Sequence, residues 1–280
     1  MGISLLTNTA SLNAQRNLNK TGNALSSNFS KLSSGQRINT AGDDAAGLAI
    51  SERMKSQIRS LSQAERNAND GISLLQTSEG ALNENSGILI RMRELSMQSA
   101  NGTLGASERE ALQTEFSQLT DEIDRIANVT EFNGQKLLNG DNASFEFQVG
   151  IGSDTNDRIT ADMVTMTSAA YGADGLDLTG LDITSAAGAQ TALDTIDQAI
   201  AATSSSRAEL GSTQNRLQVT VSNLQSANTN LSAANSRIRD VDVAEESAAM
   251  TKNNILSQAG VAVLSQANQL PSMALSLLRG

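Results

Sequence analysis

The 280-residue chain contains no Cys, no His and no Trp, and it has only one Pro, one Tyr and five Phe. Without Cys and His it cannot form a disulfide, a zinc finger, a thiolate nucleophile or a Ser-His-Asp triad. Carboxylates, Lys and hydroxyls remain, so a glycosidase-type carboxylate pair is a formal possibility, although no pocket can be inferred for it. We expect no enzyme, no catalytic residue, no cofactor and no metal site.

Positive charge and long apolar runs are also scarce. The formal net charge is −10, which argues against nucleic acid as a partner because such proteins normally present a basic face. No run of about eighteen apolar residues occurs, so we expect no membrane partner. The start, "MGISLLTNTASLNAQRNLNK", lacks the basic and apolar regions of a secretory signal peptide.

Helix-like spacing of apolar residues dominates both halves of the chain. A Pro-free pattern from Met54 to about Ala100 predicts one long helix. After the turn "ANGTLGAS", Ser107 and Glu110 have the spacing of a capping box for a third helix. The apolar seams expected in the first and third helices are Leu18, Gly22, Leu25, Phe29 and Leu32, and Leu112, Phe116, Leu119, Ile123 and Ile126.

The fourth helical pattern is the most regular. Apolar residues recur every seven positions from Leu210 to Ile238, and mostly polar residues fill the alternate core positions. Polar core positions weaken a two-stranded coil but can fix the register of a larger bundle. We therefore favour a long antiparallel helical bundle or coiled-coil rod over a lone coiled coil. The alternate positions are Gln214, Val221, Asn228 and Asn235.

A small β region is expected between the helical halves, around residues 133–190. The segment "EFNGQKLLNGDNASFEFQVG" contains two Asn-Gly turns, and Phe145, Phe147 and Val149 alternate as in a hairpin strand. The segment "DRITADMVTM" can add another strand. Residues 168–188 are small, polar and glycine-rich, which predicts an exposed connection.

Both ends of the chain are poor in charge. Residues 1–35 contain no acid, and no charged residue occurs from Asn253 to Leu278, whereas residues 36–243 have a net charge of −13. A soluble helix normally keeps a charged outer face. We expect the two ends to pair and to be covered by neighbouring subunits, and contacts that do not close would give a filament. A weakly ordered tail is the alternative, and Pro271 should kink or interrupt the last helix.

The stretch "SSGQRINTAGDDAAGLAISERM", residues 33–54, lies between two helical patterns. Gly35 and Gly42 would let the chain leave one helix and enter the next. Asp43 or Asp44 would cap the new helix, and Arg37 is a candidate partner for an acid on this or a neighbouring subunit. Two carboxylates without other ligands make a poor metal site, so we interpret the stretch as a hinge.

Long motifs at both ends make the sequence similar to the bacterial flagellins. They include "NTASLNAQRNLNK", "LSSGQRINTAGDDAAGLAISERM", "RMRELSMQSANGT", "EIDRIANVTEFNGQKLLNG" and "NSRIRDVDVAEESAAMTKNNILSQAGVAVLSQANQLPSMALSLLR". The resemblance implies a subunit that polymerises into a hollow helical filament for motility. It further implies an inner assembly layer from residues 1–43 with 239–280, and a helical rod from residues 44–238. The place of the variable outer domain of many flagellins holds only about residues 166–190, so we expect no large outer domain.

The resemblance also implies residue roles and partners. The inner-layer packing residues would be Leu18, Leu25, Phe29, Leu32, Ile255, Val261, Leu264, Leu270, Leu275 and Leu278. The expected partners are further copies of the chain, a flagellar export chaperone, a filament cap and hook-junction proteins, after export through the flagellar secretion channel to the extracellular flagellum. By the same resemblance, Arg91, Leu95 and Glu115 match residues through which Toll-like receptor 5 recognises some flagellins. A hook–filament junction protein and a secreted adhesin or signalling ligand remain alternatives.

Overall fold

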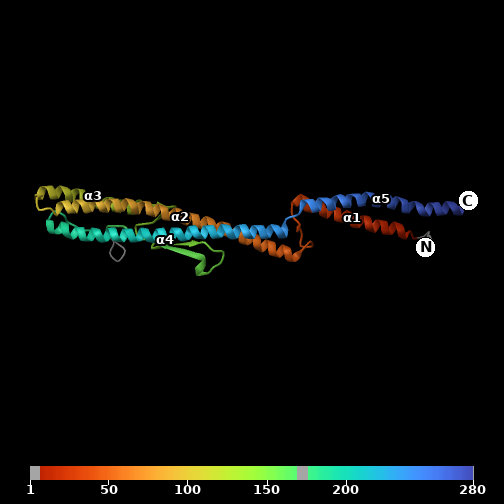
Figure 1. Ribbon diagram of the computed structural model, residues 1–280, viewed down its shortest axis with the longest axis horizontal. Helices are drawn as coiled ribbons and strands as arrows, with labels where there is room; N and C mark the ends of the chain where they lie inside the picture. Colours follow the sequence, from red (N-terminus) through yellow and green to blue (C-terminus); the bar gives the residue numbers. More distant parts are fainter. Residues whose placement is uncertain (1–6, 169–175, 280) are drawn as a thin grey trace. The chain divides into compact units, whose positions relative to one another are not determined.

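The computed structural model describes the backbone of residues 7–168 and 176–279, and side chains as far as residue 269. Five long helices dominate it, with two small antiparallel strand pairs between the third and fourth helices (Figure 1). The expectation of a mainly α fold is confirmed. None of the helices in the described part of the chain is both long and apolar enough to cross a membrane.

The chain divides into two compact units, which are described separately. The terminal unit comprises Met1–Ile58 and Asn230–Gly280, and the middle unit comprises Arg59–Thr229. The limits expected from the sequence, at residues 43/44 and 238/239, fall close to breaks between helices, whereas the units divide inside α2 and α4. The numbers of the helices and strands follow Figure 1.

In the middle unit, α2 (Ala45–Ser99) is the single long helix that the Pro-free pattern predicts. Most of its buried positions are spaced by three and four residues, which is the spacing of a coiled-coil seam. Long apolar side chains share this seam with short or polar ones, so neighbouring helices can approach closely. These positions are Leu61, Ala64, Ala68, Gly71, Leu75, Ser78, Leu82, Asn85, Leu89, Met92, Ser96 and Ser99.

Helix α3 (Ala106–Val129) buries Phe116 and Ile123, as its seam predicts. The expected capping box of Ser107 and Glu110 is wrong, because the helix begins at Ala106 and its N-cap residue, Gly105, makes no side-chain cap. Arg109 fixes the turn instead. Its side chain donates to the carbonyls of Ser99 at 2.9 Å and Asn101 at 3.0 Å. Arg109 thus connects the first turn of α3 to the end of α2.

Helix α4 (Ala186–Arg239) runs antiparallel to α2 and buries Leu210, Leu217 and Leu224, as the seven-residue repeat predicts. Cross-helix contacts hold the pair. Arg93 Nε donates to Asp197 Oδ1 at 2.6 Å, and Asn228 Nδ2 donates to Ser62 Oγ at 2.9 Å. Asn228 therefore uses its core position for a polar contact between helices.

The β region confirms both strand predictions. β1 (Glu131–Phe132) and β2 (Gln135–Lys136) are joined by Asn133 and Gly134, both with positive φ, as an Asn-Gly hairpin turn requires. β3 (Ser144–Gln148) pairs antiparallel with β4 (Arg158–Asp162), with a short 3-10 turn, η1 (Thr155–Asp157), before β4. Asn67 of α2 donates to the Gln148 carbonyl at 3.0 Å and so ties the hairpin to the helices.

The expected exposed connection over residues 168–188 is only partly right where the structure describes it, because residues such as Asp177, Thr179 and Asp182 are exposed but several apolar ones are not. Leu176, Leu178 and Ile183 are buried in the core of the middle unit. Gln113 of α3 accepts from Ile183 N at 2.7 Å and donates to the Leu181 carbonyl at 3.3 Å. The side chain of Gln113 therefore holds the segment against the bundle, where its apolar residues complete the core. No large outer domain occurs in the described part of the region between β4 and α4.

Candidate assembly surface on the terminal helices

The terminal unit is built on an antiparallel pair, α1 (Thr9–Ser34) and α5 (Val243–Arg279), which Figure 1 shows side by side in red and blue. The expected pairing of the two charge-poor ends is confirmed. Asn8 Nδ2 donates to the Ala267 carbonyl at 2.9 Å near one end of the pair, and near the other end Asn28 Oδ1 accepts from Asn253 Nδ2 at 2.7 Å.

The seam between these helices consists mainly of short or polar residues. Its positions repeat every three and four residues along both helices, as in a coiled coil. Gly260 lies so close to α1 that a side chain there would meet Leu18 at 3.3 Å. The seam positions are Ser11, Ala14, Leu18, Thr21, Leu25, Asn28 and Leu32 on α1, and Glu246, Met250, Asn253, Ser257, Gly260, Leu264 and Ala267 on α5.

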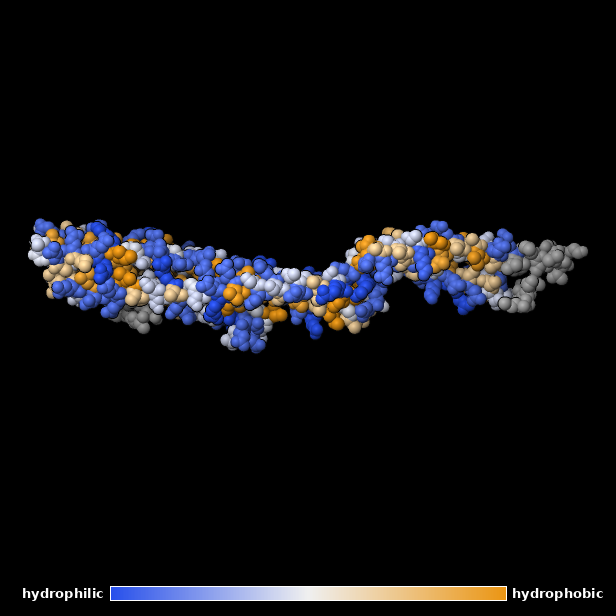
Figure 2. Space-filling model, viewed as in Figure 1, coloured by the Kyte–Doolittle hydropathy of each residue, from blue (hydrophilic) through white to orange (hydrophobic). Residues whose placement is uncertain are grey.

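Large hydrophobic side chains lie outside the seam and face solvent in the single chain. Phe29 is 67% exposed, Ile255 61% and Val261 55%. Figure 2 shows hydrophobic side chains on the surface formed by α1 and α5. On α5, Ile255 and Leu256 border a shallow groove of about 570 Å³ that is completed by Ser247, Ala248, Thr251 and Lys252. The pair thus buries mainly short and polar residues together with a few half-buried Leu, and it leaves several large apolar side chains exposed, which a soluble coiled coil normally avoids.

The inner-layer residues expected from the sequence fall into three groups. Leu18, Leu25, Leu32 and Leu264 are half-buried in the seam. Phe29, Ile255 and Val261 face outward. The side chains of Leu270, Leu275 and Leu278 lie outside the described residues.

Pro271 does not interrupt α5, which is continuous from Val243 to Arg279, so the expected interruption is wrong. A proline lacks the N–H that would donate to the carbonyl four residues earlier, here that of Ala267. Asn8 supplies the missing donor, since its Nδ2 bonds to that carbonyl. Asn8 Oδ1 also accepts from Ser11 N at 3.0 Å and so caps α1. One side chain therefore caps one helix and replaces the bond that proline removes from the other.

The predicted hinge joins α1, α2, α4 and α5 within the terminal unit. Gly35 ends α1 with φ +70, a left-handed conformation that favours glycine, whereas Gly42 has no positive φ. Gln36 forms an isolated antiparallel bridge with Asp240. Arg37 contacts no acid among the described residues. Its guanidinium instead donates to the Arg237 and Ile238 carbonyls, which the end of α4 leaves without helical partners.

Asp43 and Asp44 have separate roles. Asp44 Oδ1 accepts from Gly47 N at 2.9 Å and caps α2. Asp43 Oδ2 closes the preceding loop by accepting from the backbone N–H groups of Thr40 and Asn39 and from the Thr40 hydroxyl. Those hydrogen bonds, the Thr40 backbone bond foremost, lower the pKa of Asp43. Groups of three or more acidic residues placed to hold a metal ion do not occur in the described ranges.

Two polar contacts of the terminal unit were not predicted from the sequence. Asn28 is buried in the seam and donates to Glu246 Oε1. Arg239 Nη1 forms an ion pair with Glu52, and its Nε donates to Gln36 Oε1 at 3.0 Å. The predicted seam of α1 is wrong at Gly22 and Phe29, which are exposed, because Thr21 and Asn28 occupy the alternate seam positions instead. The Arg239–Glu52 pair joins residues far apart in the sequence and left no local signal.

The three residues of the expected receptor site lie in the middle unit. Arg91 on α2 donates to Glu115 on α3 at 2.8 Å and to Glu94 at 3.0 Å, and the hydrogen bond with Glu115 raises the pKa of Arg91. Arg91 and Glu115 are close to half exposed. Leu95 is 1% exposed and belongs to the core. The structure therefore brings the two charged residues together at the surface, with Leu95 beneath it.

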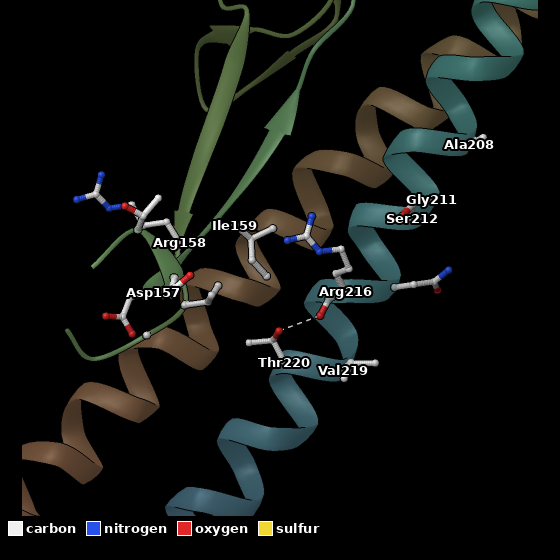
Figure 3. Close-up of a pocket in the computed structure, with 14 residues that line it drawn as sticks. Asp157, Arg158, Ile159, Ala208, Gly211, Ser212, Arg216, Val219 and Thr220 are labelled. Carbon is white, nitrogen blue, oxygen red and sulfur yellow. Dashed lines mark hydrogen bonds between the residues drawn. The ribbon is translucent and has the colours of Figure 1, made fainter. Parts of the chain in front are cut away.

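A second hollow, of about 1230 Å³, lies between the hairpin and α4 in the middle unit (Figure 3). Its ionisable side chains are Asp157, Arg158 and Arg216. Arg216 extends toward Ile159, while Arg158 and Asp157 point away from α4. One carboxylate and two guanidinium groups do not form the acid–base pair that hydrolysis of a glycoside needs.

The sequence and structure were compared with known proteins. Residues 5–143 match the family described as bacterial flagellin N-terminal helical region, and residues 193–278 match the bacterial flagellin C-terminal helical region. A flagellin of Halalkalibacterium halodurans is 50% identical over 97% of this chain and 98% of its own length. The flagellar filament 33 kDa core protein of Treponema phagedenis is 48% identical, with the same coverage.

Among solved structures, the Bacillus cereus flagellin has a TM-score of 0.50 and 36% identity, covering 61% of this chain and 94% of that one. The two family matches lie on the segments that build α1 to α3 and most of α4 and α5, so they include the paired terminal helices. The chain belongs to the flagellin family.

Proposed function

We propose that this chain is a structural subunit that polymerises into the flagellar filament, with the outward faces of α1 and α5 packed against the same helices of neighbouring copies. One observation carries the proposal. The seam between the paired terminal helices holds mainly short and polar residues beside a few half-buried Leu, whereas Phe29, Ile255 and Val261 are exposed. Association with further copies would remove this apolar surface from water, at about 25 cal/mol for each Å² covered.

The charge distribution supports self-association through this unit. No charged residue occurs from Asn253 to Leu278, so copies can approach along α5 without repulsion between like charges or the cost of burying unpaired ones. A surface that is not complementary to itself gives head-to-tail contacts, and such contacts extend into a filament when they do not close. The middle unit, with its charged exterior, would face water.

Deletion of residues 253–280 tests the proposal. We expect a soluble monomer whose middle unit unfolds at the wild-type temperature but which does not elongate filament seeds, measured by light scattering and electron microscopy. Wild-type chain is the positive control. Normal filaments from the truncated chain would contradict the assignment of α5.

The same assay separates the alternatives. A wild-type chain that binds seeds but does not elongate them would behave as a hook–filament junction protein. If it neither elongates seeds nor restores swimming to a flagellin-less strain, a secreted adhesin or signalling role gains weight. In the filament proposal, an export chaperone near the C-terminus, a filament cap and hook-junction proteins are the further partners, and the chain leaves the cell through the flagellar secretion channel.

Recognition of the monomer by Toll-like receptor 5 is a finer part of the proposal. It rests on the family resemblance of Arg91, Leu95 and Glu115 and on the surface position of the Arg91–Glu115 ion pair. Leu95, being buried, would support this surface and not contact the receptor. We expect an Arg91→Ala monomer to activate receptor-bearing reporter cells less than wild type. Arg125→Ala removes a comparably exposed ion pair on α3 and serves as the control; equal loss in both variants would refute the site.

A further inference from the structure

We infer that the core of the middle unit holds a structural water site at Asn85, between α2 and α4. Asn85 is completely buried at a seam position of α2. Neither its Oδ1 nor its Nδ2 has a hydrogen-bond partner among the described residues. Buried carboxamides are almost always hydrogen-bonded, so this side chain requires a ligand that the chain itself does not supply. This inference goes beyond the proposed filament role and does not depend on it.

The helix register brings other polar groups to the same level. In the contacts Arg93–Asp197, Glu65–Gln225 and Ser62–Asn228, the two residue numbers always add up to 290. Asn85 is therefore level with position 205 of α4. Thr203 and Ser206, which flank that position, are both buried.

A second buried atom without a partner lies close to this level. Arg207 is level with position 83, about 3 Å along the helix axis from Asn85. Its Nη2 reaches Glu79 at 4.0 Å, while its Nε is buried without a partner among the described residues. The register thus places the α-carbons of Asn85 and Arg207 within one helical turn, with the Arg207 Nη2 on the side of Glu79.

The donors and acceptors of Asn85, Arg207, Thr203 and Ser206 indicate that the ligand at this level is water. Asn85 Nδ2 and Arg207 Nε are donors without acceptors, and Asn85 Oδ1 is an acceptor without a donor. The hydroxyls of Thr203 and Ser206 donate to the Ala199 and Ala202 carbonyls, and that of Thr203 also contacts Met166 Sδ at 4.0 Å, so both oxygens keep the capacity to accept. Water both donates and accepts, so it can bond to the carboxamide and to one or two of the other groups. An apolar ligand would leave the carboxamide unsatisfied, and a metal cation would meet the Arg207 guanidinium.

A crystal structure of the full-length monomer, at a resolution that shows ordered water, tests the inference. We expect a water peak about 2.7–3.2 Å from Asn85 Oδ1 or Nδ2 and within the same distance of a second group, Arg207 Nε or a hydroxyl of Thr203 or Ser206. The inference is overturned if the Asn85 carboxamide bonds directly to protein groups or has no peak beside it.

A matched pair of variants identifies Asn85 as the ligand. Asn85→Leu should remove the peak, and Asn83→Leu, the same change at an exposed position of α2, should leave it in place. A peak that persists in Asn85→Leu would overturn the assignment. If Asn85→Leu does not fold, Asn85→Ser keeps a polar group and should keep a displaced peak. Loss of the peak in Asn85→Ser would also count against the site.

Discussion

Asn8 has two roles that substitution can separate. Its Oδ1 caps α1, and its Nδ2 donates to the Ala267 carbonyl that Pro271 leaves without a helical donor. Asn8→Ala removes both bonds. Asn8→Asp keeps a good cap but removes the donor and places a carboxylate beside a carbonyl oxygen. We expect a loss of about 1 kcal/mol for the cap and about 0.5–1.5 kcal/mol for the bond to Ala267.

Hydrogen exchange of α5 amides around Ala267 is the assay, because protection falls tenfold for each 1.4 kcal/mol of local stability. Asn8→Asp should lower protection of α5 roughly 2- to 13-fold, and Asn8→Ala should in addition lower protection of the first turn of α1 about fivefold. Asn19→Asp, an exposed change on α1 about three turns from Asn8, is the control and should leave both segments unaffected.

A double-mutant cycle with Pro271→Ala tests whether the Asn8–Ala267 hydrogen bond matters because proline removes the helical donor. Alanine at position 271 restores the N–H that can bond to the Ala267 carbonyl, so Asn8→Asp should cost less in that background. We expect a coupling free energy of about 0.5–1.5 kcal/mol between the two changes. Costs that add within about 0.3–0.5 kcal/mol would refute the link between Asn8 and Pro271.

Two further predictions concern the outward face and the hinge. Phe29→Ala should raise the critical concentration for polymerisation roughly 5- to 30-fold, because burial of the two-thirds of this side chain now exposed is worth about 1–2 kcal/mol. The thermal midpoint of the monomer should stay unchanged, unlike that of Leu32→Ala in the seam; an unchanged critical concentration would contradict the surface. At Asp43 the folded pKa is lowered, so its contribution to loop stability is present above the ordinary aspartate pKa of about 3.9 and is lost as pH falls through the lowered value. Amide exchange at Asn39 and Thr40, corrected for intrinsic rates, should therefore lose protection only in acid, whereas Asp43→Ala should lack it at every pH; protection that persists in Asp43→Ala would disprove the role of the carboxylate.

Local patterns in the sequence determined the helices. Absence of Pro and regular apolar spacing were sufficient for α2, and the seven-residue repeat from Leu210 was sufficient for α4. The Asn-Gly pair at 133 and the alternation at Phe145 and Phe147 indicated the hairpins, since turn chemistry and side-chain alternation are local properties. The lack of charge from Asn253 to Leu278 likewise pointed to a helix that needs protein around it.

Only the tertiary structure showed which residues distant in the sequence form hydrogen bonds or pack together. Helix α3 begins at Ala106 and does not use the predicted Ser107 capping box; the Arg109 side chain in its first turn donates to the Ser99 carbonyl at the end of α2. Within the glycine-rich connection, Leu178 and Ile183 are buried because they pack against the helical bundle. Pro271 lies within the continuous helix α5, and Asn8, 263 positions earlier in the chain, donates to the Ala267 carbonyl, which has no helical donor because of the proline. Such contacts join residues distant in sequence, whereas periodicity and propensity describe only neighbours.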